Sequence, residues 1–396
     1  VLRLSMPTLP YADVIAPYLA GVHFLVWCTL LANILYLRKK RARASLSTEP
    51  FVSILIPARN EEDNLKRLLP SLLEQTYENV EVIVVDDGST DGTWTVLQDA
   101  RDERLRPVKG DGPPPGWLGK PHACYVAAQQ ASGERYLFLD ADTELRDPEA
   151  LRRIVERQQA LPKDTVATGL PRLRGAAQLL VSLVPNAILT GLPWPLVRPL
   201  RMSSLGALNG QCWMVDAERY HAYEPHVEVK NKVLEDVEIG RYFKREGFTP
   251  ALLDVRDEIT VYMYASFKEA WNGFRKNAYL ILGGSPIAFV GLYVFFFLTF
   301  VASPFIHPGF LASVVLLKAT TDRLTRFSPF LALAAPVSYF LGSALQLDSA
   351  ISHWTGRVSW KGRKVGAAAI RQTREASQNG RASPQASLDS ATESES

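Results

Sequence analysis

The sequence predicts an α/β protein in which a Rossmann-like, mostly parallel sheet with helices on both faces is joined to transmembrane helices. The first observation is that short apolar runs alternate with segments of helical periodicity between Phe51 and Gln159. Such alternation is typical of parallel, doubly wound sheets. The second is that long apolar stretches precede and follow this region, and ~20 apolar residues are enough to span a membrane.

The composition bounds the class of protein. The chain has 396 residues, which is enough for a soluble domain and membrane segments. Its content of 47% hydrophobic and 21% charged residues excludes a disordered chain. The formal net charge of +3 is too small to favour a nucleic-acid partner. Cys28, Cys124 and Cys212 lie far apart, without the paired spacing of a zinc site, which fits a reducing compartment without disulfides.

The N-terminal segment predicts a membrane anchor. Val14 to Leu37 contains no charged residue, and basic residues follow at positions 38, 39, 40, 41 and 43. Positive flanks tend to remain in the cytoplasm. A cleaved signal peptide would have a shorter apolar part and its charge in front. We therefore expect an uncleaved anchor with its basic flank over residues 1–43, and a cytoplasmic globular domain over residues 44–278.

The elements of this domain are predicted from apolar runs and turn residues. Expected strands are Phe51–Pro57, Val80–Val85, Leu105–Val108 and Tyr136–Leu139. Expected helices are Glu61–Gln75, a helix opened by Asp91-Gly92-Thr93, then Gly119–Ala131 and Lys232–Gly247. Ligands of parallel sheets bind outside the carboxyl ends of the strands. The polar residues that fall there are Asn60, Asp86, Asp87, Asp140 and Asp142.

Asp140 and Asp142 directly follow the strand Tyr136–Leu139. Side chains alternate along an extended chain, so both carboxylates can project into one crevice. Two carboxylates at a buried edge are costly unless a positive charge neutralises them, and a hard divalent cation such as Mg or Mn fits that need. The alternative is that they cap the next helix, a role for which Asp147-Pro148 is better placed.

Four segments together resemble the family-2 glycosyltransferases of the GT-A fold. They are Pro57-Ala58-Arg59-Asn60-Glu61, Val85-Asp86-Asp87-Gly88-Ser89-Thr90-Asp91-Gly92-Thr93, Gly119-Lys120 and Asp140-Ala141-Asp142. The resemblance implies an enzyme whose first segments hold the base and ribose of a nucleotide-sugar donor, and whose Asp-x-Asp holds diphosphate and metal. It assigns the metal to Asp142 and Asp140, and the donor nucleotide to Pro57, Ala58, Asn60, Glu61, Asp86, Asp87, Lys120 and Asp140.

Lys120 also has a physical argument of its own. It stands at the start of an expected helix, where free N–H groups and the helix dipole favour anions, and its side chain can reach a diphosphate. The alternative is an ordinary surface lysine.

Lys232–Gly247 is the second chemical centre, because Glu235 and Asp236 stand at the start of that helix. In the family this Glu-Asp pair supplies the catalytic base, which by position would be Asp236. A base is needed because an acceptor hydroxyl sheds its proton as it attacks the anomeric carbon, and a carboxylate within reach contributes ~10²–10⁴-fold. The alternative is an acidic helix N-terminus, which the helix dipole also favours.

Two segments are expected near the acceptor. Leu208–Val215 resembles the family segment that lines the acceptor side of the crevice. The resemblance implies an acceptor side formed by Gln211, Cys212, Trp213, Glu235 and Trp271. Trp271 and Arg275 are four residues apart on one helix face, where processive polysaccharide synthases carry Gln-x-x-Arg-Trp. That signature is missing here, which leaves Arg275 as an expected diphosphate contact in the donor site.

The loop and helix start from Gly110 to Cys124, GDGPPPGWLGKPHAC, resemble a membrane-bound branch associated with carotenoid and hopanoid glycosylation. This implies an inverting transfer from a UDP-linked donor to a lipid, with a carotenoid or other terpenoid as the leading acceptor. Three alternatives stay open: a polyprenyl-phosphate glycosyltransferase, a processive polysaccharide synthase, and a non-catalytic nucleotide-sugar-binding membrane scaffold. The first shares every donor motif, the second would carry the missing signature, and the third would be expected to have lost an acidic group.

A C-terminal membrane region is expected over residues 279–364. Pro286–Phe305 and Phe330–Leu347 are candidate spans, whereas Phe310–Leu317 is short and runs into Lys318 and Asp322, which are expensive to bury unless they pair. We expect two full crossings, with the middle segment at the far membrane surface. The basic residues 357–364 and a disordered tail, residues 365–396, would then be cytoplasmic.

The apolar segment Ala176–Leu200 is interrupted by four prolines, so it is unlike a span. It is expected either on the membrane surface or in the domain core.

Overall fold

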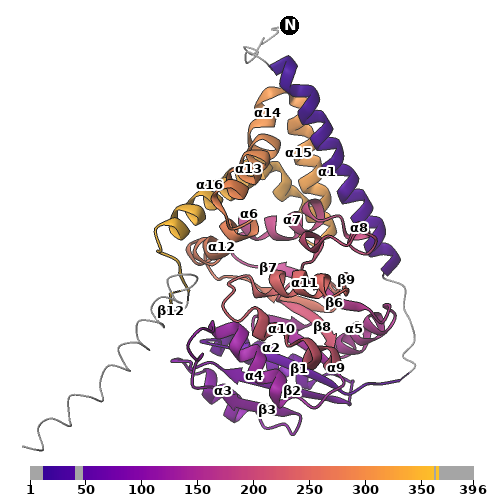
Figure 1. The fold of residues 1–396 in the computed structure, drawn as a ribbon, viewed down its shortest axis with the longest axis vertical. Coiled ribbons are helices and arrows are strands. Elements are labelled where there is room, and N and C mark those ends of the chain that lie inside the picture. The colour runs from indigo at the N-terminus through magenta and orange to yellow at the C-terminus, as the bar shows by residue number, and fades with distance from the viewer. Residues whose placement is uncertain (1–11, 41–47, 361–362, 365–396) are drawn as a thin grey trace, which may run out of the picture.

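The structure is a computed structural model that describes residues 12–40, 48–360 and 363–364. The tail expected at residues 365–396 lies outside the described residues. Figure 1 shows a sheet-containing domain below a group of helices that narrows away from it. Helix α1, Ala12–Lys40, runs along one edge of this group, from its narrow end towards the domain (Figure 1).

The main sheet has seven strands in the order β3-β2-β1-β4-β8-β6-β9. In chain order these are β1 Val52–Ala58, β2 Val80–Asp86, β3 Leu105–Lys109, β4 Arg135–Leu139, β6 Thr165–Leu170, β8 Cys212–Asp216 and β9 Thr249–Asp254. Only β8 runs antiparallel to its neighbours, β4 and β6. The predicted mostly parallel sheet is therefore confirmed, and its four predicted strands are β1 to β4.

Alternation along β1 explains why its sequence is continuously apolar. Ile54 and Ile56 pack on the face covered by α2, Glu62–Leu73, whereas Leu55 packs on the opposite face with Ala123 and Ala127 of α4, Gly119–Gln130. Both faces of a central parallel strand are buried, so apolar side chains predominate; the exception, Ser53, is buried and donates to Glu81 Oε1 at 2.6 Å. The carboxyl ends of the parallel strands and the starts of the helices that follow them therefore lie at one edge of the sheet.

The remaining elements complete the domain around this sheet. A second sheet has the order β5-β10-β7, with strands β5 Thr143–Leu145, β7 Arg172–Arg174 and β10 Ile259–Tyr262. The helices are α3 Thr93–Asp99, α5 Ala150–Gln159, η1 Ser203–Leu205, α9 Ala217–Tyr223, α10 Pro225–Glu228, α11 Glu235–Arg245 and α12 Phe267–Ile281. A short hairpin is formed by β11 Ser359–Trp360 and β12 Arg363–Lys364.

The proline-rich segment Ala176–Leu200 lies at the junction between domain and membrane helices. It forms α6 Gln178–Val181, α7 Leu183–Gly191 and α8 Trp194–Val197, which Figure 1 places between α1 and the sheet. Asn33 of α1 donates to the carbonyls of Leu189 and Leu192 at 2.7 and 2.8 Å, which ties this segment to the anchor. Leu189 is fully buried, as expected for a part of the core, whereas Leu196 and Leu200 are exposed.

Three stretches of the described chain are long and apolar enough to cross a membrane: Asp13–Lys39, Pro286–Ile306 and Pro329–Trp354. They correspond to the three predicted spans. The second is formed by α13 Pro286–Phe296, the π-helical η2 Phe297–Ala302 and α14 Ser303–Ile306, and the third by η3 Pro329–Ala334 and α16 Ala335–Trp354. Helix α16 lies against α12, and its end bonds to α12 where His353 Nε2 is 2.9 Å from the Lys276 carbonyl.

The segment between the last two stretches was expected at the far membrane surface, and its place relative to a membrane stays a prediction. It forms α15, Pro308–Leu324, which packs against α14, α1 and α7. Lys318 and Asp322 are fully buried in it, and their charged groups pair at 2.5 Å. Just beyond the helix, Arg326 pairs with Asp257 of the sheet domain at 3.0 Å, so α15 returns to that domain. Pairing offsets part of the cost of burying the two charges, and that cost was the argument against such a helix.

Candidate functional site

Three elements bring their charged residues to one point at the carboxyl edge of the sheet. Lys120 lies in the first turn of α4, Asp140 directly follows β4, and Glu235 opens α11. The Lys120 ammonium is 2.8 Å from Asp140 Oδ1 and 2.9 Å from Glu235 Oε1. Burial opposes the charge of Lys120, but Asp140, Glu235 and Asp236 outweigh it and raise its pKa well above the ordinary value. Lys120 is therefore a fixed positive charge at the centre of the site.

Asp236 is held beside this cluster by two backbone donors. The Gly210 N–H donates to its Oδ2 at 2.7 Å and the Val237 N–H to its Oδ1 at 2.9 Å. A Cβ on Gly210 would lie 3.0 Å from the Lys120 ammonium nitrogen and 3.1 Å from Asp236 Oδ2, so a glycine allows this close approach. Burial and the neighbouring Glu235 raise the pKa of Asp236 to about 6, against the opposing effect of Lys120. A carboxylate with this pKa can accept a proton near neutral pH.

The loops after β1 and β2 are locked together. Asn60 adopts a left-handed conformation with φ of 51°, its N–H donates to Ser89 Oγ at 2.9 Å, and its Oδ1 accepts from the Thr90 N–H at 2.8 Å. Arg59 donates to the Asp87 carbonyl at 2.7 Å. Asp86 is buried under this loop, where its Oδ1 accepts from the Ser89 N–H at 2.9 Å.

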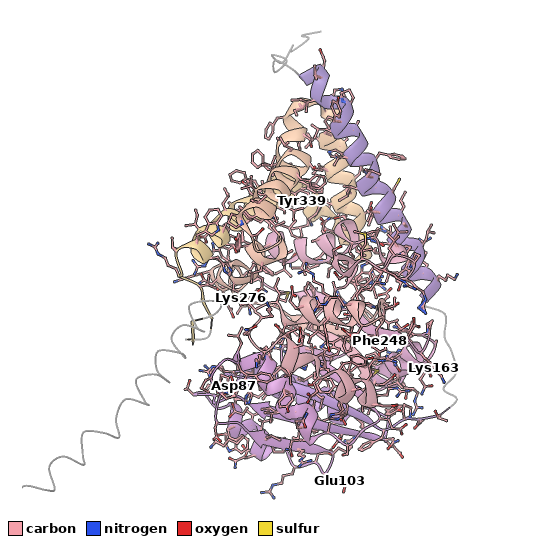
Figure 2. The ribbon with its side chains drawn as sticks, in the orientation of Figure 1. Asp87, Glu103, Lys163, Phe248, Lys276 and Tyr339 are labelled. Carbon is pink, nitrogen blue, oxygen red and sulfur yellow. The ribbon has the colours of Figure 1, made fainter. Side chains whose placement is uncertain are left out.

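A single large cavity of about 2340 Å³ connects these groups. Its lining includes most of the residues expected to bind donor or metal: Pro57, Ala58, Asn60, Glu61, Asp87, Lys120, Asp140 and Asp142, together with Gln211, Glu235 and Asp236. The cavity continues past the domain into the membrane helices. In Figure 2, three of its lining residues mark this course, from Asp87 in the domain through Lys276 at the junction to Tyr339 among the helices.

The structure corrects the expectation for α12. Arg275 is not among the cavity-lining residues and instead points to Asp348 of α16, with 3.8 Å between their charged atoms. Trp271 likewise donates to Asp348 Oδ2 at 2.7 Å and faces α16 rather than an acceptor. The next residue, Lys276, lines the cavity in their place. Burial lowers the pKa of Lys276, and Glu235 and Asp140 act in the opposite direction.

Sequence reasoning missed Lys276 and also Tyr264, which lines the same cavity. Burial, and after it the Asp142 carboxylate, raises the pKa of Tyr264, and its backbone has φ of 49°. The one available signal was the basic pair at positions 275 and 276, of which the family pattern favoured the first member.

The acceptor-side residues divide into two groups. Gln211 and Glu235 line the cavity. Cys212 and Trp213 are buried in the core of β8, where the Trp213 ring stacks on Phe138 with 4.2 Å between centroids. The last two therefore support the sheet beneath the cavity and do not form its wall.

Asp140 and Asp142 form a donor set that suits a divalent cation. Both line the cavity, and no group of three or more His, Cys, Asp or Glu side chains placed to hold a metal occurs in the described parts of the chain. Two carboxylates suffice for Mg or Mn when phosphate oxygens and water supply the other ligands, because Mg is usually bound in this way. The residues therefore fit a cation held jointly with a diphosphate.

Comparisons with known proteins agree with this geometry. Residues 53–177 match the sequence profile of Glycosyl transferase family 2. A 4,4'-diaponeurosporenoate glycosyltransferase of Staphylococcus haemolyticus is 28% identical over 266 residues, which cover 65% of this chain and 68% of that protein. A protein of the same description from Staphylococcus aureus is 24% identical over 342 residues, covering 79% of this chain and 88% of its own.

The comparison with solved structures supports the fold. A mannosyltransferase from Pyrobaculum calidifontis, solved in complex with GDP-Man and Mn²⁺, superposes with a TM-score of 0.50 at 19% identity. The alignment covers 87% of this chain and 99% of that one. The chain thus carries a family 2 glycosyl transferase domain of the GT-A fold, and it is a glycosyltransferase.

Proposed function

We propose that this protein transfers a sugar from a nucleotide donor, UDP-linked by the family resemblance, to the polar end of a long terpenoid lipid such as a carotenoid. The observation that carries the proposal is the continuity of the cavity, which joins the carboxylates around Lys120 to an apolar compartment between membrane helices. A donor can occupy the charged end while a lipid occupies the apolar end.

The apolar compartment, here called the acceptor channel, is walled by several helices. Its lining includes Val22 and Leu25 of α1, Leu183 of α7, Phe296 of α13, and Tyr339 and Gly342 of α16. A small-molecule site usually encloses ~300–1,000 Å³, so a cavity of about 2340 Å³ has room for two substrates. The match to two proteins described as 4,4'-diaponeurosporenoate glycosyltransferases favours a carotenoid-like acceptor.

The mechanism follows from the three charged centres. The acceptor oxygen attacks the anomeric carbon, and the bond between that carbon and the diphosphate oxygen breaks in the same in-line step, which inverts the centre. Where the acceptor is a hydroxyl, Asp236 takes its proton, because its pKa of about 6 leaves it largely ionised at neutral pH. Lys120 and Lys276 face the cavity where the departing diphosphate develops charge.

Asp142 and Asp140 would hold the divalent cation. A bound Mg or Mn would supply additional neutralisation of the diphosphate charge.

The channel can be tested by filling it. Gly342 lines the channel, and an added Cβ would lie 2.9 Å from Leu183 Cδ1, so the flexible end of that leucine would have to shift into the channel. Gly342→Leu, in the full chain reconstituted in nanodiscs, is expected to raise KM for a long terpenoid acceptor at least ~10-fold while donor affinity stays unchanged. A truncated acceptor of the same end group should be affected much less.

Gly291→Leu is the matched control, because Gly291 is an exposed glycine of α13 with no atom within 4 Å of an added Cβ. Equal behaviour of the two variants towards the long acceptor would refute the channel. Polyprenyl phosphate offered in parallel separates the rival acceptor class: preferential transfer to it would replace the carotenoid-like assignment.

A further inference from the structure

A second cavity lies where the sheet domain meets the membrane helices, and we infer that it binds the phosphate headgroup of an anionic phospholipid. It encloses about 460 Å³ and is lined by Arg146, Arg172, Arg323 and Arg326, together with Asp257, Phe327 and Pro329. We call it the arginine pocket. It is separate from the cavity that holds the catalytic groups, because none of its lining residues is shared with that cavity.

The charge of the arginine pocket is unbalanced. Four guanidinium groups line it with a single carboxylate, Asp257, which pairs with Arg326 at 3.0 Å. Within residues 12–40 and 48–360, no carboxylate lies within salt-bridge distance of Arg146, Arg172 or Arg323. An arginine stays protonated at any physiological pH, so these charges cannot be relieved by proton loss.

The arginines also act on one another. Arg172, in β7, is half-buried, and burial together with the charges of Arg174, Arg146 and Arg326 lowers the pKa of its guanidinium. Arg146 keeps its orientation by donating to the Arg256 carbonyl at 3.1 Å. A phosphate bound between these guanidinium groups would reduce their mutual repulsion. It would also accept charge-assisted hydrogen bonds, which guanidinium groups form in bidentate geometry.

The surroundings of the pocket favour a lipid over free phosphate. Arg323 lies in the last turn of α15, which packs among the membrane helices. Pro329 begins η3, whose Phe330 and Leu333 are 78% and 75% exposed. Large exposed apolar side chains directly beside the arginines place the pocket where acyl chains give way to headgroups.

The arginine pocket lies between the sheet domain and the end of α15. Arg172 belongs to β7 and Arg146 directly follows β5, both in the β5-β10-β7 sheet region. Tyr262, the last residue of β10, and Tyr264, which follows that strand, line the catalytic cavity. Arg323 belongs to α15, and Arg326 directly follows the end of that helix. A bound headgroup would therefore hold the wall of the catalytic cavity against the bilayer surface.

The test compares lipid retention by the full chain. Protein purified in mild detergent is exposed to equal amounts of phosphatidylglycerol and phosphatidylcholine, and retained lipid is quantified by native mass spectrometry. Wild type is expected to retain phosphatidylglycerol at least ~10-fold better, because arginines near the bilayer surface attract anionic headgroups. The double variant Arg172→Gln/Arg323→Gln should lose that preference.

The matched control is Arg101→Gln/Arg245→Gln, which removes two exposed arginines from the domain outside the pocket. It should keep the preference for phosphatidylglycerol, and nucleotide-donor affinity and the melting temperature report that both double variants are folded. An unchanged preference in the Arg172/Arg323 variant overturns the inference. A third arm measures the binding of inorganic phosphate. If phosphate binds wild type but not the Arg172/Arg323 variant, while wild type retains the two lipids equally, the pocket is a free-phosphate site instead.

Discussion

At the scale of single residues, the site depends on one lysine that neutralises two carboxylates from different elements. Lys120 contacts both Asp140 and Glu235, and Asp236 lies close enough for its charge to act on the lysine. Because Asp236 is buried and next to Glu235, its pKa is raised to about 6 rather than lowered by the lysine. Among the three carboxylates around Lys120, Asp236 therefore has a pKa at which a carboxylate can accept a proton near neutral pH.

Asp236→Asn is expected to lower kcat by ~10²–10⁴-fold with donor affinity within a few-fold, because an amide cannot accept the acceptor's proton. Initial rates and donor titration calorimetry measure the two quantities separately. Loss of donor binding together with turnover would make Asp236 a donor-site or structural residue.

The pH profile tests the same residue without removing it. The active form is the carboxylate, so kcat/KM with a hydroxyl acceptor should fall as the pH drops through about 6. Glu235→Gln removes a negative charge that raises the pKa of Asp236, so the acidic limb should move to lower pH. A limb that stays in place in this variant would contradict the assignment of Asp236 as the titrating base.

Asp142 is the residue that we propose to make donor binding depend on a metal. Asp142→Asn should abolish transfer and make donor affinity insensitive to Mg or Mn, because an amide is a weaker ligand for a hard cation than a carboxylate. Donor titrations with and without chelator measure this, and Asp99→Asn, an exposed carboxylate at the end of α3, is the control. Near-normal turnover of wild type in metal-free buffer would show the assignment to be wrong.

At the scale of elements, α15 shows how a helix that packs among apolar helices can bury two charges. Lys318 and Asp322 are four residues apart, so they share one helix face, and Ser182 Oγ accepts from the same ammonium at 2.9 Å. Next to them, Asn186 donates to Thr321 Oγ1 at 3.0 Å. These contacts attach α15 to the segment α6–α7 and so to the wall of the acceptor channel.

Lys318→Met should destabilise the protein by ~3–5 kcal/mol, because it leaves Asp322 buried without its counter-charge. Thermal unfolding in detergent measures the loss. The double variant Lys318→Met/Asp322→Leu should recover most of it, since replacing a buried pair with apolar residues is often nearly neutral. Lys268→Met, at an exposed position of α12, is the control; a melting temperature equal to that control would show that the pair contributes nothing.

At the scale of the whole molecule, the membrane helices form an outgoing arm and a return arm. The outgoing arm is α13, η2 and α14, and the return arm is α15, whose end is tied to the domain through Arg326 and Asp257. Helix α16 then lies against α12. Because Arg326 pairs with Asp257 before α16 begins and His353 bonds to α12 at its end, we predict that both ends of α16 lie on the side of the sheet domain.

Cysteine labelling distinguishes this arrangement from the expected pair of full crossings. In a background without the three native cysteines, His307→Cys at the turn between α14 and α15 should react with a membrane-impermeant thiol reagent in intact cells. Ser328→Cys, after α15, and Thr355→Cys, after α16, should react only after lysis. All three positions are outside the buried core. Labelling of Ser328→Cys before lysis would return α15 to the far membrane surface.

Much of the fold could be read from the sequence because it depends on neighbours within a few residues. The apolar runs of β1, β2 and β4 and the helical periodicity between them predict a buried parallel sheet, and polar residues at the strand ends mark its functional edge. Asp140, Asp142 and Asp236 follow from motifs placed directly after a strand or at a helix start. These patterns depend only on residues close together in the sequence, so they could be recognised without the structure.

Contacts between distant elements were decided only by the tertiary structure. Lys276 rather than Arg275 reaches the cavity because α16 covers the face of α12 that carries Arg275 and Trp271. The pairing of Lys318 with Asp322 permits a return helix that the separate charges argued against. The acceptor channel and the arginine pocket likewise consist of residues from elements more than 100 positions apart. Periodicity tells which face of a helix is apolar, but the packing of neighbours determines which polar residue meets a ligand.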